Sequence, residues 1–172
     1  MHAHSATGTP HTPGPGRQRV CVLGATGTIG RSTVAALVRR GHEVVCLVRP
    51  RAGVGGSLSP EDTVRLLQGA TVKLVDAADP VSLRREGFDG ERFDAVVSCM
   101  ASRTGVPKDA WAVDHRAHIN VMEAAKRSGV GHFVLLSAIC VQRPLLAFQL
   151  AKLAFEKALI SSGMRLLIAT EN

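Results

Sequence analysis

Short apolar runs alternate along the chain with longer segments of helical periodicity. The apolar runs predict strands at Arg19–Leu23, Glu43–Val48, Thr71–Val75, Phe93–Cys99, His132–Ser137 and Met164–Ala169. The segments between them predict helices at Thr28–Arg40, Pro60–Gln68, Val81–Glu86, Val113–Ser128 and Leu145–Ser162. Strands that alternate with helices, and that are apolar on both faces, predict a doubly wound parallel α/β sheet, the Rossmann fold. Ligands of such sheets bind at the carboxyl ends of the central strands.

The first 18 residues differ from the rest of the chain. They are rich in Pro, Gly, Ser, Thr and His and show no periodicity, so we expect a disordered tail over 1–18 and one domain over 19–172. The tail resembles neither a secretory signal nor an organelle transit peptide, which favours the cytoplasm. No apolar run approaches the roughly 18 residues of a membrane-spanning helix.

The charge balance favours an anionic partner. The chain has 21 Lys and Arg against 14 Asp and Glu, a net charge of +7. Aromatic residues make up 3%, with one Trp and no Tyr, so stacking rings for single-stranded nucleic acid are lacking. We therefore expect a small anionic ligand and no nucleic acid, and we leave open a peripheral contact with an acidic membrane surface.

The cysteines and histidines do not have the spacing that is typical of metal ligands. Each of the four cysteines lies in or beside an apolar run and none forms a CxxC pair, which predicts small buried side chains at Cys21, Cys46, Cys99 and Cys140. His115 and His118 are three residues apart, but no third ligand type accompanies them. We expect no metal site.

A glycine-rich turn between the first strand and the first helix predicts a dinucleotide site. Gly24 would turn the chain, Gly27 would admit a pyrophosphate and Gly30 would let helix and sheet approach. The phosphates would bind the N–H groups at the helix N-terminus, and the alternative is a structural turn alone. The expected ligating residues are Gly24, Thr26, Gly27, Thr28, Ile29 and Gly30.

Three later segments refine the expected cofactor contacts. An acidic residue usually follows the second strand in NAD-binding chains, but Arg49 stands there, which favours the 2′-phosphate of NADPH over a solvated arginine. Asp76 would bind the adenine edge or form a helix N-cap. The small residues Ala101 and Ser102 would let the dinucleotide pass, or would reflect packing alone.

The expected reaction site lacks its usual acid. Short-chain dehydrogenases carry a Ser after strand five and then Tyr-x-x-x-Lys, and here Ser137 is followed by Phe148 and Lys152. We take Ser137 and Lys152 as candidate catalytic residues, with Lys152 either holding the nicotinamide ribose or exposed to solvent. Without Tyr, hydride addition to a conjugated carbon–carbon double bond suits the site. The leucines of this helix, Leu146 and Leu150 among them, predict a core-facing stripe.

Longer motifs carry a family resemblance. The stretches are VSCMASRTG over 97–105, KDAW over 108–111, HFVLLSAICVQ over 132–142, and PL with FQLAKLAFE between 144 and 156. They resemble the NADPH-dependent divinyl chlorophyllide 8-vinyl reductases, an atypical short-chain dehydrogenase group. The resemblance implies NADPH as cofactor, a tetrapyrrole substrate and a role in (bacterio)chlorophyll biosynthesis. The carboxylate that such a substrate carries fits the surplus of basic residues in the chain.

The resemblance also reveals a departure from the family pattern. In that family the sixth strand runs into an Arg-Pro turn and a substrate-binding region, whereas Thr170-Glu171-Asn172 ends this sequence. We therefore expect a truncated or frame-shifted product with little or no turnover. The alternative is an NADP-binding sensor or interaction protein without catalysis, and a nucleotide-sugar epimerase or dehydratase is disfavoured by the missing Tyr.

Overall fold

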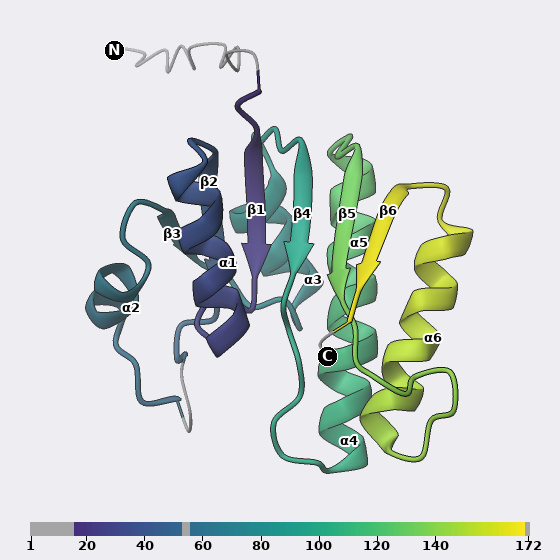
Figure 1. Ribbon diagram of the computed structural model, residues 1–172. Helices are drawn as coiled ribbons and strands as arrows, with labels where there is room; N and C mark the ends of the chain where they lie inside the picture. The colour runs from purple at the N-terminus through teal and green to yellow at the C-terminus, as the bar shows by residue number, and fades with distance from the viewer. Residues whose placement is uncertain (1–15, 53–55, 171–172) are drawn as a thin grey trace, which may run out of the picture.

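A parallel sheet with the strand order β3-β2-β1-β4-β5-β6 organises the chain (Figure 1). The computed structural model describes residues 16–52 and 56–170, so most of the expected tail lies outside the described residues. The strands are β1 (Arg19–Leu23), β2 (Glu43–Val48), β3 (Thr71–Leu74), β4 (Ala95–Ser98), β5 (His132–Leu136) and β6 (Arg165–Ala169). This order confirms the doubly wound Rossmann fold.

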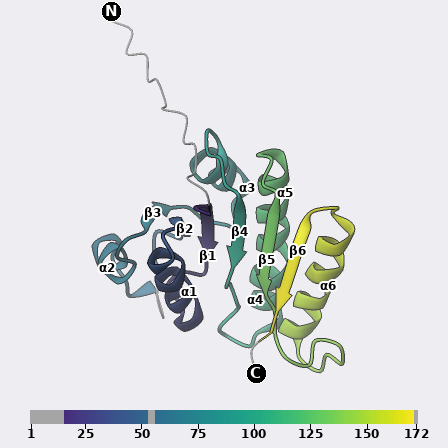
Figure 2. The ribbon, with the colours of Figure 1, turned by 45° about the horizontal axis from the view of Figure 1, so that its top comes forward.

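Helices cover both faces of the sheet. They are α1 (Thr28–Arg39), α2 (Pro60–Leu66), α3 (Pro80–Ser82), the π-helix η2 (Leu83–Phe88), α4 (Pro107–Ala110), the π-helix η3 (Trp111–Ala117), α5 (His118–Arg127) and α6 (Ala147–Ser161). Figure 2 shows α1 and α2 on the side of the sheet opposite α5 and α6. None of the helices in the described part of the chain is long and apolar enough to cross a membrane.

Two cores sandwich the central strands, which explains their continuous apolar sequence. In β1, Cys21 and Leu23 belong to the core beneath α5 and α6, while Val20 and Val22 belong to the core beneath α1. All four side chains are at most 2% exposed. A strand buried on both faces cannot show the alternation of polar and apolar residues that marks a half-exposed strand.

The helix expected at Val113–Ser128 begins earlier. Residues from Pro107 to Arg127 form one uninterrupted helical run, in which η3 separates α4 from α5. Pro107 is the first residue of this run, a position that tolerates proline because its missing N–H has no intrahelical partner. The π-helical turn widens the helix where Asp114 and Ala117 are buried.

The core-facing stripe expected for α6 is wrong at Leu146 and Leu150, whereas its other two members, Leu153 and Ala154, are half-buried. Leu146 is 55% exposed and Leu150 is 46% exposed. The face that α6 buries consists of Gln149, Ala151, Lys152, Phe155 and Leu159. Two long polar side chains take part in this face because each finds hydrogen-bond partners there.

The expectation of four buried cysteines holds for two of them. Cys21 and Cys46 are buried, and burial raises the pKa of the Cys46 thiol to about 12. Cys99 is half-buried, and Cys140 is exposed in a loop with φ of 62°. The apolar run that contains Cys140 extends past the end of β5, so its last residues leave the sheet.

Candidate functional site

The glycine turn after β1 is packed too tightly for side chains at two of its positions. Gly24 has φ of 71°, and a methyl group built on it would lie 2.5 Å from the Cys99 carbonyl carbon. A methyl group on Gly30 would lie 2.0 Å from the Gly24 carbonyl oxygen. The turn therefore lies directly against the end of β4, and α1 starts directly above the turn.

Gly27 differs because a methyl group there would meet only ordinary van der Waals contacts. A methyl group on Gly27 would lie 3.5 Å from the Gly24 carbonyl oxygen and 3.9 Å from Arg103 Nη2, both ordinary contacts. Gly27 is the N-cap of α1, no side chain caps this helix, and its first turn holds no acidic residue. The N–H groups of Thr28 and Ile29 are thus free of intrahelical partners beside a cradle that a Cβ would fill. This geometry fits a pyrophosphate.

The next two strands end in exposed charged residues. Arg49 directly follows β2 and is exposed. Asp76 follows β3, and its Oδ1 accepts the Ala78 N–H at 2.9 Å. The N-cap of α3 is Asp79, whose side chain accepts the Val81 N–H, so the helix N-cap role considered for Asp76 belongs to Asp79.

The loop after β4 is anchored by a buried carboxylate. Asp114, in η3, accepts the Ser102 N–H at 3.2 Å and also the Ser102 hydroxyl. Ala101 beside it is exposed. Sequence reasoning gave Asp114 no role.

Lys152 is the second member of this cluster. Its Nζ lies 3.2 Å from Asp114 Oδ1 and donates to the carbonyl oxygens of Met100 at 3.1 Å and Leu136 at 3.3 Å. The side chain is 3% exposed. An ammonium group has three N–H donors, so protein groups occupy all of them, and a ribose hydroxyl would have to replace one partner.

A cavity of about 520 Å³ opens where β4 and β5 end, and it brings together the expected reaction residues. Its lining includes Ser102, Ser137, Phe148 and Lys152. The Ser137 hydroxyl donates to Glu156, one helical turn beyond Lys152 on α6. Phe148 occupies the place where short-chain dehydrogenases carry their tyrosine, so this wall of the cavity is apolar.

His118, which is not part of the cavity lining, has a buried and neutral side chain. Its Nε2 contacts Ser98 Oγ at 2.8 Å, and its Nδ1 donates to the Val113 carbonyl oxygen at 2.8 Å. Burial lowers the pKa of His118 to about 3. Among the residues that the structure describes, no three His, Cys, Asp or Glu side chains gather as metal ligands.

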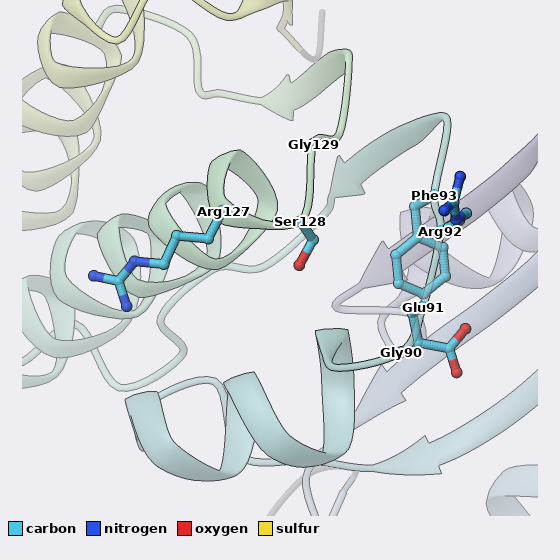
Figure 3. Close-up of a pocket in the computed structure, with 7 residues that line it drawn as sticks. All are labelled: Gly90, Glu91, Arg92, Phe93, Arg127, Ser128 and Gly129. Carbon is cyan, nitrogen blue, oxygen red and sulfur yellow. The ribbon is translucent and has the colours of Figure 1, made fainter.

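A second hollow, of about 790 Å³, lies at the opposite end of the strands, where β4 and β5 begin. Figure 3 shows it between the segments 90–93 and 127–129, which precede β4 and β5, with the Arg127 side chain extending away from Phe93. Doubly wound sheets bind their ligands at the carboxyl ends of the strands. The candidate site is therefore the glycine turn together with the smaller cavity.

Comparison with known proteins assigns the chain to a family. A family model described as NAD(P)H-binding matches residues 24–165. The chain belongs to this NAD(P)H-binding family. Membership confirms a nicotinamide cofactor as the expected ligand class, and the match begins at Gly24, the first glycine of the turn.

Individual relatives add detail to the family assignment. The divinyl chlorophyllide a 8-vinyl-reductase of Zea mays is 48% identical over 146 residues, which cover 85% of this chain and 36% of that protein. The photosystem II assembly factor Ycf39 of Synechocystis is 31% identical over 70% of this chain and 34% of that protein. This NAD(P)H-binding chain thus spans about a third of the length of these curated relatives, and the resemblance seen in its motifs is confirmed.

Solved structures support the fold. The Bordetella bronchiseptica enzyme WbmH, solved in complex with NAD+, superposes with a TM-score of 0.72 at 23% identity. The superposition covers 90% of this chain and 56% of that one. The TM-score shows that the NAD(P)H-binding chain shares the fold of WbmH, and at this sequence identity the likeness extends to the fold alone.

Proposed function

We propose that this chain is the NADPH-binding part of a reductase that converts the 8-vinyl group of a divinyl chlorophyllide or protochlorophyllide to ethyl, in (bacterio)chlorophyll biosynthesis. The observation that carries the proposal is the 48% identity with the Zea mays 8-vinyl-reductase over 85% of the chain. The cavity beside the glycine turn supports it, because Phe148 stands there in a chain that contains no Tyr.

The proposed chemistry needs no phenol. A bound nicotinamide cofactor would supply the hydride for one vinyl carbon and a proton would add to the other, so that the carbon–carbon double bond would become a single bond. The charge that develops is delocalised into the macrocycle, so no strong acid has to stand at a substrate oxygen. Lys152 and Ser137 are the proposed catalytic residues: Lys152 would orient the nicotinamide ribose, and Ser137, whose hydroxyl donates to Glu156, lines the cavity.

The cofactor contacts follow from the placement of the strand ends. The turn from Gly24 to Gly30 would bind the pyrophosphate, Asp76 the adenine, and Ala101 and Ser102 would lie along the dinucleotide. Arg49 carries the choice of NADPH, since an exposed guanidinium after β2 suits a 2′-phosphate and no acidic residue stands there to accept ribose hydroxyls.

For the compartment, we propose the bacterial cytoplasm, with the plastid as the alternative. The Zea mays relative is named as a chloroplastic protein, which supports the alternative. For the partner, we propose a tetrapyrrole substrate.

A second candidate function is an NADP-binding sensor or interaction protein without catalysis. Two observations favour it. The donors of Lys152 and Ser137 are all taken by protein groups, and the Synechocystis relative, at 31% identity, is named an assembly factor.

Two measurements on the same protein separate these functions. NADPH is added first and thermal stabilisation recorded, and divinyl chlorophyllide is then added and the absorbance shift followed as the vinyl group is lost. Stabilisation with a shift supports the reductase, stabilisation without a shift supports the sensor, and no stabilisation refutes both. Arg49→Ala tests the cofactor: NADPH should lose its advantage over NADH, and equal binding of both by the unsubstituted chain would refute the role of Arg49.

A further inference from the structure

A cationic side chain reaches the glycine turn from the other half of the sheet. Arg103 lies in the loop between β4 and α4, and its Nη2 stands 3.9 Å from the position that a methyl group on Gly27 would take. Within the described part of the chain, its guanidinium forms no ion pair or hydrogen bond with a carboxylate. A positive group thus lies beside the uncapped N-terminus of α1 with its charge available to a ligand.

The backbone of Arg103 is held in place while its side chain is left to bind. Asp109 Oδ2 accepts the N–H groups of Arg103 and Thr104, both at 3.4 Å, and the Thr104 hydroxyl at 2.9 Å. On the other side, Asp114 anchors Ser102. Both acidic residues nearest to Arg103 along the helical run are therefore committed to the loop backbone and hydroxyls, and the loop is held on both sides of Arg103.

Arg103 also lines the cavity that holds Phe148 and Lys152. It therefore stands between the glycine turn and that cavity. In the proposed site this is the point where the pyrophosphate joins the nicotinamide half of the dinucleotide. The planar guanidinium fork matches two oxygens of a phosphate group, whereas the helix N–H groups would face the pyrophosphate from the other side.

We propose that Arg103 is a ligand of the dinucleotide pyrophosphate, closing over it from the side opposite the N-terminus of α1. This inference rests on the proposed NADPH site. It assigns the two exposed arginines different tasks: Arg49 binds the 2′-phosphate that only NADPH carries, and Arg103 binds the pyrophosphate that NADPH and NADH share. The two roles therefore predict different nucleotide dependences.

The experiment titrates NADPH and NADH, by nucleotide fluorescence, into the unsubstituted chain and into Arg103→Gln, Arg103→Lys and Lys108→Gln. Arg103→Gln should weaken both nucleotides by the same factor, about 10- to 100-fold, because charged hydrogen bonds to the shared pyrophosphate are lost. Arg103→Lys should recover part of the affinity. Lys108→Gln, which removes an exposed charge from the same segment, should bind like the unsubstituted chain.

Three results would overturn the inference. Binding of both nucleotides by Arg103→Gln with undiminished affinity would show that Arg103 is not a ligand. A loss confined to NADPH would show that it binds the 2′-phosphate instead. A failure of the unsubstituted chain to bind either nucleotide would refute the proposed function together with this inference, so the two failures are distinguishable. Circular dichroism melting confirms that each variant is folded.

Discussion

Lys152 and Asp114 form an ion pair in the interior, with 3.2 Å between Nζ and Oδ1 and side-chain exposures of 4% and 0%. The pair joins α6 to the π-helix η3. Through Ser102, Met100 and Leu136, it also ties down the ends of β4 and β5. A charge buried this deeply depends on its partner, because the partner replaces the water that each group gave up on folding.

Removal of one member of this pair should therefore destabilise the protein strongly. Lys152→Met leaves the Asp114 carboxylate buried with only Ser102 as a donor, and we expect the free energy of unfolding to fall by about 3–5 kcal/mol. The double variant Lys152→Met/Asp114→Leu should recover a large part of this loss, since both buried charges are gone. Urea unfolding of Lys152→Met, of Asp114→Leu and of the double variant gives the coupling free energy between the two residues.

Lys157→Met is the matched control for this cycle because it removes an exposed lysine from the same helix. It should change the free energy of unfolding by less than about 0.5 kcal/mol. Strictly additive losses in the double variant would contradict an energetic coupling between Lys152 and Asp114.

The glycine turn should separate folding from cofactor binding. Gly27→Ala places a methyl group at ordinary contact distances, with Gly27 at φ of −75°, so the fold should lose about 1 kcal/mol or less. That methyl group would fill the cradle, and NADPH affinity should fall at least about 10-fold. Gly30→Ala would bring a methyl group within 2.0 Å of the Gly24 carbonyl oxygen and should unfold the chain. Thermal melting and NADPH titration measure the two effects.

Gly131→Ala serves as the control, since a methyl group there would lie 3.8 Å from the Asp94 carbonyl oxygen, at the opposite edge of the sheet. It should melt and bind like the unsubstituted chain. Unchanged NADPH affinity in Gly27→Ala would argue that the cradle does not hold the pyrophosphate.

Sequence patterns predicted the strands well because apolar runs and burial coincide there. The bounds expected for β1 and β2 match the structure to the residue, and the glycine turn lies where its motif placed it. The three glycines predicted to have distinct tasks do face different surroundings: a methyl group would collide with backbone at Gly24 and Gly30 but would make only ordinary contacts at Gly27. The contact between Gly30 and the Gly24 carbonyl oxygen lies within the motif itself, so the motif suffices to predict it, whereas the contact of Gly24 with Cys99 joins distant segments.

Properties that depend on distant partners were not predicted. The leucine stripe pointed to the wrong face of α6, because hydrophobicity alone cannot show that Gln149 and Lys152 find buried partners on other elements. Asp114 received no role for the same reason: its contacts to Ser102 and Lys152 join segments far apart in sequence. Periodicity also fails at η3, because a π-helical turn shifts the side chains that follow it.

His118 should make stability depend on pH. Its pKa is lowered to about 3 in the folded protein, chiefly by burial, from an ordinary value of 6.5. The unfolded chain therefore binds more protons between these values, so the contribution is fully present above pH 6.5 and is lost as the pH falls toward 3. We expect a slope of up to about 1.4 kcal/mol per pH unit. Urea unfolding at a series of pH values measures it.

His118→Gln should reduce this slope while keeping a side chain that can hydrogen-bond Ser98 and the Val113 carbonyl oxygen. His132→Gln, at the start of β5, leaves His118 in place and serves as the control. The same slope in His118→Gln as in the unsubstituted chain would assign the pH dependence to other groups.

Gln149 should control the order of the loop between β5 and α6. Its Oε1 accepts the N–H groups of Leu145 at 2.9 Å and Leu146 at 3.1 Å, and its Nε2 donates to the Ile139 carbonyl oxygen at 3.2 Å. Gln149→Met removes all three bonds. We expect faster hydrogen exchange of the peptide spanning 138–146 and a loss of about 1–3 kcal/mol in the free energy of unfolding.

Two further variants test the geometry of this contact. Gln149→Glu keeps oxygen acceptors for the amides of Leu145 and Leu146 but loses the donor to Ile139, so it should restore protection at those two amides. Gln142→Met changes an exposed glutamine of the same loop and should exchange like the unsubstituted chain. Exchange of 138–146 that is equally slow in Gln149→Met would mean that the loop is ordered by its own backbone. Since Ile139 lines the cavity with Phe148, a disordered loop should also weaken binding of an apolar ligand there.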